Sequence, residues 1–129
     1  MLVVALVLAA LAALLHVVIF LMEAVLFARP AVHERFRTRA EDLAAVRPWA
    51  LNQGFYNLFL AVVAVVGVVL AAAGSHEVGL ALVLAACGSM VAAALVLAAT
   101  DRRMVQAALT QGTVPALAVV AAVAALAQG

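Results

Sequence analysis

Residues 1–28 read MLVVALVLAALAALLHVVIFLMEAVLFA, an apolar run that only His16 and Glu23 interrupt. A helix needs about 20 apolar residues to cross a bilayer, and this run is long enough. Alanine and leucine follow one another here without the alternation of a barrel strand, so the run predicts a spanning helix. No arginine or lysine precedes it, as one would in a signal peptide, so we expect the run to be retained.

Three further apolar runs cover residues 50–73, 78–99 and 113–127. The first two are long enough to span. The last reaches only about 21 Å between residues 114 and 127, so we expect it to lie where the bilayer is thinned or to pair with a tilted neighbour. The predicted fold is all-α: an integral membrane four-helix bundle, with residues 1–129 forming a single transmembrane domain.

The composition excludes several classes of protein. Hydrophobic residues make up 71% of the chain and charged residues 10%, whereas soluble domains have about 45–50% and about 25%. A soluble monomer is therefore excluded, because the chain lacks the polar residues to coat its surface. The net charge of +1 excludes a nucleic-acid binder with a basic surface. A single cysteine, Cys87, excludes an internal disulfide and a cysteine-based zinc site.

The arginines predict the orientation. The chain has no lysine; five arginines lie within residues 29–47, and Arg102 and Arg103 lie between the third and fourth runs. With four spans these two segments share a side, which the positive-inside rule places in the cytoplasm, with both termini outside. Arginine without lysine, among abundant alanine and valine, is typical of a GC-rich bacterium, so we expect a bacterial inner-membrane protein.

Residues 29–49 form the only extended polar segment. Thr38 and Glu41 have capping-box spacing, which predicts a short amphipathic cytoplasmic helix over about residues 39–46, ended by Pro48. The favoured interpretation is a surface helix that tethers two spans, and the alternative is a lid over a cytoplasmic opening. We expect His33, in the same segment, to be solvated.

Polar side chains gather in the halves of the spans nearest the arginines. His16 and Glu23 share one helix face, because seven residues make nearly two turns. The other polar positions on this side are Asn52, Gln53, Tyr56, Asn57, Thr100, Asp101 and Gln111. The pattern predicts a polar pocket that opens toward the cytoplasm, with His16 at its deepest point.

Glu23 favours a functional pocket over a purely structural cluster. A carboxyl group in hydrocarbon must find a partner or take up a proton, and no lysine exists to pair with it. We therefore expect the pocket to bind a small lipophilic or amphipathic molecule and to convert it by acid–base chemistry, with Glu23, His16 and Tyr56 as the catalytic residues. The ligand-binding residues would then be Asn52, Gln53, Asn57, Thr100, Asp101 and Gln111.

Three alternatives stay open. The first is a small proton-coupled transporter acting as a homodimer or homotrimer. The second is haem binding, with His16 as an axial ligand; no other cofactor or metal is expected. The third is a structural protein without a ligand, whose polar groups only join helices. Small residues four apart, at Gly67 with Ala71 and at Gly88 with Ala92, predict close helix contact within the bundle or an oligomer.

Four motifs in chain order resemble a known family: H-x6-E from His16, N-Q-G-x-Y-N from Asn52, T-D-R from Thr100 and Q-G-x-x-P-A from Gln111. This arrangement, over about residues 5–126, is similar to the small bacterial and fungal membrane proteins called domain of unknown function 1304. The resemblance implies four spans and marks these positions, but it implies no activity. Where the family commonly has an aromatic residue just after the histidine, this chain has Val17 and Val18.

Overall fold

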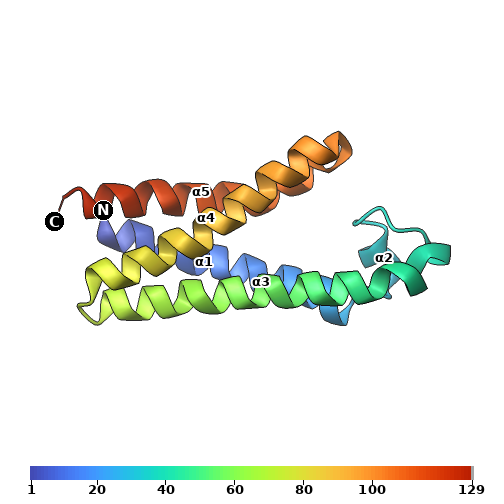
Figure 1. Ribbon diagram of the computed structural model, residues 1–129, viewed down its shortest axis with the longest axis horizontal. Coiled ribbons are helices and arrows are strands. Elements are labelled where there is room, and N and C mark those ends of the chain that lie inside the picture. The colour runs from blue at the N-terminus through green and yellow to red at the C-terminus, as the bar shows by residue number, and fades with distance from the viewer. Residues whose placement is uncertain (129) are drawn as a thin grey trace.

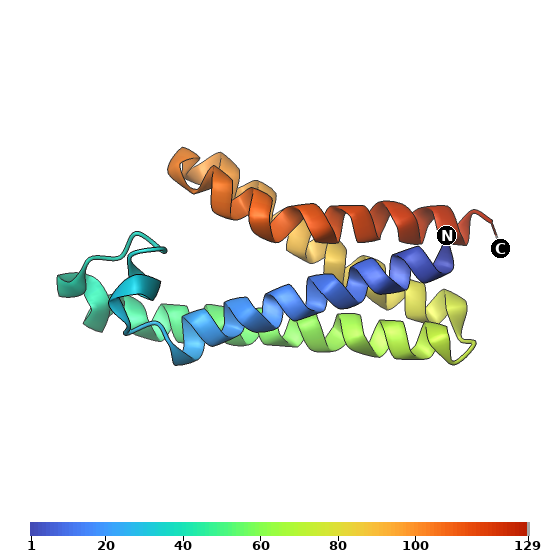
Figure 2. The same ribbon diagram turned by 180° about the vertical axis from the view of Figure 1, so that it is seen from behind.

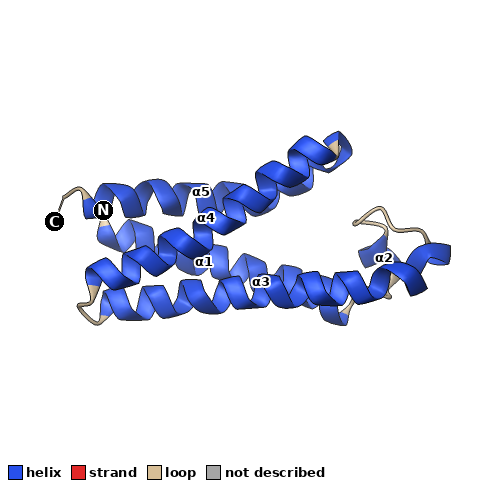
Figure 3. Cartoon of the chain, viewed as in Figure 1, coloured by secondary structure: helices blue, strands red, loops and turns tan. Residues whose placement is uncertain are grey.

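The computed structural model describes residues 1–128, and within them every regular element is a helix (Figures 1 and 3). The first long helix is α1 (Leu2–Phe20), which continues through the short turn η1 (Leu21–Val25). The other long helices are α3 (Leu43–Ala72), α4 (His76–Thr100) and α5 (Val105–Leu126). The connections contain α2 (Pro30–His33), η2 (Ala40–Asp42) and η3 (Arg102–Met104). The four long helical segments are each long and apolar enough to cross a membrane.

The four long helices form an antiparallel bundle. Helix α1 packs against α3 and α5, and α4 packs against the same two helices, so α1 and α4 lie on one diagonal. Both termini and the α3–α4 turn lie at one end, while the two arginine-bearing connections lie at the other (Figure 2). We call these the alanine end and the arginine end. The expectation that all arginine-bearing segments share one end of the bundle therefore agrees with the fold.

Small residues let the helices approach closely at the alanine end. Ala5, Ala9 and Ala12 are fully buried along one face of α1. A Cβ atom added to Gly79 would lie 2.4 Å from the backbone nitrogen of Ala71, so α3 and α4 meet there nearly backbone to backbone. The close contact predicted from Gly67 with Ala71 is thus found within the bundle.

Gly88 in α4, unlike Gly79, makes no close contact with another helix. A Cβ atom added there would meet nothing within 4 Å, and Ala92 one turn later is exposed. The contact inside the bundle is therefore not found for this pair, and a contact in an oligomer stays a prediction.

The arginine end is splayed. There the α4–α5 hairpin leans away from α1 and α3, and the segment between η1 and α3 lies beside the opening (Figures 1 and 2). The bundle is therefore closed by alanine packing at one end and widened at the end where the polar residues lie.

The second helix is longer than its apolar run. It begins at Leu43, rather than near residue 50, and it continues through Pro48. Proline lacks an N–H group for the carbonyl of Ala44, but Ala44 is exposed in the helix's first turn, where another donor can reach that carbonyl. A separate amphipathic helix over residues 39–46 is not found, since η2 leads directly into α3 and no side chain caps the start of η2 at Arg39.

The fourth helix is also longer than expected. It starts at Val105, eight residues before the predicted start, and its 22 residues span about 33 Å. Its threonines satisfy their own hydroxyl groups: Thr110 donates to the carbonyl of Gln106 at 2.9 Å, and Thr113 donates to that of Leu109 at 2.7 Å. Such local bonds remove the cost of placing a hydroxyl group in apolar surroundings. The helix can therefore include the more polar residues 105–112 that precede the apolar run.

Candidate functional site

A cavity of about 270 Å³ lies between the helices in the splayed half of the bundle. Its apolar walls include Leu60, Met90 and Leu97. Its polar lining consists of His16, Glu23, Gln53, Tyr56, Asn57 and Gln111. The structure thus brings together six of the nine residues that the sequence assigned to the pocket, and they come from α1, η1, α3 and α5.

Glu23 and Asn57 are paired across two helical segments. Asn57 Nδ2 donates a 2.8 Å hydrogen bond to Glu23 Oε2, and it also donates to the carbonyl of Gln53 at 3.2 Å. The amide nitrogen has two hydrogens and uses both. Glu23 Oε1 accepts no hydrogen bond from the described residues, so one carboxyl oxygen stays available to the cavity.

Glu23 stands on a π-helical turn. The N–H of Leu26 donates to the carbonyl of Leu21 at 2.9 Å, a five-residue step that widens the chain relative to an α-helix. Such turns are rare, and they occur most often at functional sites. An uninterrupted helix was expected here, because neither glycine nor proline marks the turn.

The close packing of α3 against η1 explains why the N-Q-G-x-Y-N motif has a glycine at position 54. A Cβ atom added at this position would lie 3.0 Å from the Cβ of Ala24 and 3.2 Å from the Cβ of Glu23. The backbone of α3 therefore passes directly against the π-helical turn. This close approach lets Asn57, three residues further along α3, reach the carboxyl group of Glu23.

His16 is the most deeply buried polar group of the cavity, with 2% of its surface exposed. Its Nδ1 lies 2.9 Å from the carbonyl of Ala12. A carbonyl only accepts, so Nδ1 carries the proton, and in the neutral ring Nε2 is left as an acceptor. Among the described residues no fully buried side-chain nitrogen or oxygen lacks a partner. Nε2 has no protein partner, so it is not one of the fully buried atoms and must be accessible. Because His16 lines the cavity, Nε2 is accessible from the cavity.

Tyr56 and Gln53 form the accessible rim of the cavity. Tyr56 is 61% exposed although it lines the cavity, and Gln53 is exposed one turn before Asn57. Gln111 lines the cavity from α5, and Pro115 four residues later cannot donate the usual backbone bond to its carbonyl. Asn52 is exposed and does not line the cavity, so the structure leaves it outside the site.

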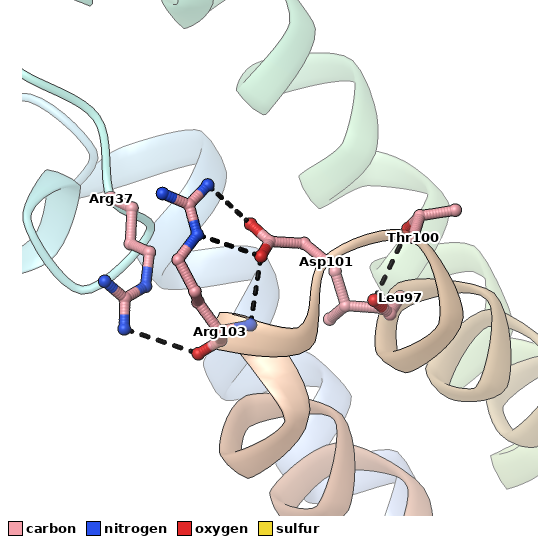
Figure 4. Close-up of polar contacts among 5 residues, drawn as sticks. All are labelled: Arg37, Leu97, Thr100, Asp101 and Arg103. Atoms are coloured by element: carbon pink, nitrogen blue, oxygen red, sulfur yellow. Dashed lines mark hydrogen bonds and ion pairs between the residues drawn. The ribbon is translucent and has the colours of Figure 1, made fainter.

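Thr100 and Asp101 also lie outside the cavity, because they build the α4–α5 turn (Figure 4). Thr100 donates to the carbonyl of Val96 at 2.8 Å, and a second, longer contact reaches that of Leu97 at 3.4 Å. Asp101 accepts from the backbone N–H of Arg103 at 3.0 Å and from its guanidinium at 3.0 and 3.1 Å. The side-chain bond from Arg103 is the main cause that holds the pKa of Asp101 below its ordinary value.

The segment between η1 and α3 is a folded cap. Arg37 Nη2 donates to the carbonyl of Arg103 at 3.3 Å, which joins this segment to the α4–α5 turn (Figure 4). The aromatic rings of Phe27 and Phe36 pack with their centroids 5.9 Å apart, and Phe36 lines the cavity. Phe36 was missed from the sequence, because no spacing within the polar segment of residues 29–49 shows that it turns toward the spans.

His33 is buried in this cap, contrary to the expectation of a solvated side chain. Only 4% of it is exposed, and its Nδ1 lies 2.7 Å from the carbonyl of Thr38. The N–H of Thr38 donates in return to the carbonyl of His33 at 2.9 Å. The histidine thus closes the turn between α2 and η2, a contact between residues five apart that spacing alone does not reveal.

No group of three or more histidine, cysteine or carboxylate residues that could hold a metal occurs within residues 1–128. In the cavity, the chemistry available is that of one carboxyl group, one imidazole, one phenol and three amides. This set can bind a polar group by hydrogen bonds and can move a proton.

The family comparison covers most of the chain. A family model described as "Protein of unknown function (DUF1304)" matches residues 10–123, a range that holds all four motifs, so the resemblance seen in the sequence is confirmed. No curated protein and no solved structure matches the chain.

Proposed function

The chain belongs to the DUF1304 family, whose description states no activity, and we propose that it is a membrane protein that binds a small lipophilic molecule in the cavity beside Glu23. One observation carries the proposal: six polar side chains from separate helical segments line a single cavity of about 270 Å³. An apolar hollow with a few converging polar groups is the usual form of a small-molecule site.

The proposed setting is a bacterial inner membrane, with the arginine end in the cytoplasm. Four apolar helices of spanning length support the membrane, and the arginines of both connections support this orientation. In this orientation the cavity lies in the cytoplasmic half of the bilayer, where a molecule dissolved in the membrane can reach it.

The hydrogen bonds favour a ligand over a purely structural role. Polar residues that only join helices are expected to bond to one another across them. Among the described residues, the bond between Asn57 and Glu23 is the only side-chain hydrogen bond that joins two of the long helical segments. His16 bonds within its own helix, and it therefore leaves Nε2 free to accept from a ligand.

The same groups support acid–base conversion of the bound molecule. Glu23 Oε1 and His16 Nε2 can each accept a proton, neither has a hydrogen-bond partner within residues 1–128, and both belong to side chains that line the cavity. Tyr56 at the rim adds a hydroxyl group that can orient an oxygen of the ligand. Proton transfer alone is enough for an isomerisation, cyclisation or hydration.

Transport has less support than binding. A transporter needs its site to open alternately to both sides, and the alanine end is closed by fully buried residues such as Ala5, Ala9 and Ala64. The nearly backbone-to-backbone contact of Gly79 with Ala71 lies at the same end and leaves no room for an opening between α3 and α4.

A pair of neighbouring alanines allows a matched test. Both are exposed, but Ala93 lines the cavity and Ala92 does not. Ala93→Phe should fill the cavity, and Ala92→Phe adds the same volume outside it. We expect mass spectrometry to find a small molecule in the organic extracts of the wild type and of Ala92→Phe, and not in the extract of Ala93→Phe.

An absorption spectrum of the same purified proteins would reveal haem. Identical extracts from all three proteins would overturn the proposal.

A further inference from the structure

A second hollow lies on the outer surface, between α1 and α5. This groove has a volume of about 110 Å³ and runs along Leu15, Val18 and Met22 on the first helical segment. These residues cover about 10 Å of helix length. Val18 is 44% exposed, so in a membrane the groove would face the lipid.

The groove and the cavity share part of their lining. Phe36, Met104, Ala107 and Gln111 contribute to both hollows. The partition between them therefore consists of few side chains, and two of these, from Phe36 and Met104, are long groups on the connections at the arginine end. Methionine in particular adapts its shape to what lies beside it.

We infer that the site takes a long-chain amphiphile with a hydrogen-bond-donating head group, whose head lies in the cavity and whose hydrocarbon chain lies in the groove between α1 and α5. This inference rests on the proposed function, and it adds the class of ligand and its path. The ligand would enter sideways from the bilayer, past Phe36 and Met104.

Two basic atoms of the cavity without a protein partner, on Glu23 and His16, determine the head group, whereas the free amides of Gln53 and Gln111 can either donate or accept. Glu23 uses Oε2 to accept from Asn57, and His16 uses Nδ1 to donate to Ala12. The remaining Glu23 Oε1 and His16 Nε2 are acceptors when the carboxyl is ionised and the ring neutral. A hydroxyl group on the ligand supplies one hydrogen, which it can donate to either of these two atoms.

The apolar groove sets the chemistry of the tail. Its walls are mostly aliphatic, with Leu15, Val18 and Ile19 on one side and Ala107 on the other. A hydrocarbon chain that leaves the bilayer for this groove moves from one apolar surrounding to another, so its length contributes little to selectivity. Discrimination among amphiphiles should therefore come from the head group.

Two photoreactive long-chain primary alcohols test the inference with the full chain in lipid nanodiscs. One carries a diazirine near the hydroxyl group, and the other carries it near the methyl end. We expect the first probe to label cavity residues such as Leu60, Met90 and Leu97, and the second to label groove residues such as Leu15, Val18 and Met22. The labelled residues are identified by peptide mass spectrometry.

A head-group competition accompanies the labelling. An unlabelled long-chain alcohol should displace the probes roughly tenfold better than its methyl ether, because the ether has no hydrogen to donate to the acceptor on Glu23 or on His16. Equal competition by alcohol and ether would contradict the assigned head group.

Matched variants on α5 test the path. Ala107→Phe adds bulk to the shared partition, whereas Val120→Phe adds bulk at a position that is 67% exposed and lies outside both hollows. Labelling of the groove by the second probe should be lost in Ala107→Phe and kept in Val120→Phe. A variant that fails to fold is recognised by its thermal unfolding, and the two probes on the wild type then decide alone.

The outcomes separate this inference from the proposed function. If the first probe labels the cavity and the second labels lipid-facing positions without preference, the path through the groove is wrong and the binding cavity stands. If the second probe labels the cavity and the first labels the surface near Arg35, the ligand lies in the reverse orientation and the inference is overturned. If neither probe labels the cavity and no molecule is extracted from the wild type, the proposed function fails as well.

Discussion

Asn57 holds the carboxyl group of Glu23 with a 2.8 Å hydrogen bond that runs from α3 to the π-helical turn η1. Every other side-chain hydrogen bond within residues 1–128 stays in one long helix or joins residues of the connections. The pair thus fixes the position of the acid while it leaves Oε1 uncommitted. A binding site needs its acid held but still accessible, and the arrangement provides both.

The Glu23–Asn57 pair should stabilise the fold modestly. Asn57→Ala removes the donor, and we expect it to lower the free energy of unfolding by about 1 kcal/mol. Glu23→Gln keeps an acceptor for Asn57 and should unfold like the wild type. Equilibrium unfolding in mixed micelles measures both values. If Glu23→Gln destabilised the protein as much as Asn57→Ala, the carboxylate itself would have a structural role.

Two glycines of α4 should respond oppositely to the same substitution. Gly79→Ala places a Cβ atom 2.4 Å from the backbone nitrogen of Ala71 and should cost about 1–3 kcal/mol, because α3 and α4 must separate. Gly88→Ala meets nothing within 4 Å and should be neutral or stabilising by up to about 1 kcal/mol, since alanine favours a helix. Thermal unfolding of both variants in one detergent gives the comparison. A large loss in Gly88→Ala would instead reveal a contact with another copy of the chain.

Gly54→Ala should weaken ligand binding by displacing Glu23. The added Cβ lies 3.0 Å from Ala24 and 3.2 Å from Glu23, so the π-helical turn must move away from α3. Gly112→Ala is the control, because its Cβ would lie 2.7 Å from the Cβ of Ala94 in a contact between α4 and α5. We expect both variants to lose stability, and only Gly54→Ala to lose the extracted small molecule. Equal retention of that molecule by the two variants would show that the position of Glu23 does not matter for binding.

Arg37 combines a hydrogen bond with a strained backbone. Its φ of 56° lies in the left-handed region, which costs an L-residue about 1–2 kcal/mol. Arg37→Gly and Arg37→Ala both lose the 3.3 Å bond to the carbonyl of Arg103, but only glycine removes the strain. We expect Arg37→Gly to have the higher melting temperature of the two. Identical melting temperatures would mean that the backbone relaxes when the arginine is replaced.

Asp101 should make stability depend on pH in the acid range. The hydrogen bonds from Arg103 lower the pKa of this carboxyl in the folded protein, so the folded state favours the ionised form. The resulting stabilisation is present above the unfolded pKa of about 3.9, and it is lost as the pH falls through the folded pKa. Asp101→Asn should therefore lose less of its stability than the wild type between pH 5 and pH 2, as thermal unfolding would show. Parallel pH profiles would contradict this account of the turn.

The number of long helices, and the end of the bundle at which the polar groups gather, could be predicted from the sequence. Apolar runs of spanning length predict helices directly, and the spacing of His16 and Glu23 predicts that they share one helix face, with His16 the deeper of the two. The helix ends at Leu43 and Val105 were missed, because helices continue through polar residues whose groups bond locally.

The shape of the site could not be predicted from the sequence. The π-helical turn at Glu23 depends on how η1 packs against Gly54, and no single residue marks it. Thr100 and Asp101 were assigned to the pocket because they end their span on the same side as the other polar residues, yet the splay of α4 and α5 carries the α4–α5 turn away from the cavity. Phe36 joins the cavity only because the cap folds back over its opening.

Native mass spectrometry of the intact protein, released from nanodiscs, tests the central claim most directly. The account predicts one small molecule bound per chain in the wild type and in Ala92→Phe, and none in Ala93→Phe, with all three proteins folded. A wild type that carries no bound mass when it is purified from its native membrane would contradict the account, as would an Ala93→Phe protein that retains the same bound mass.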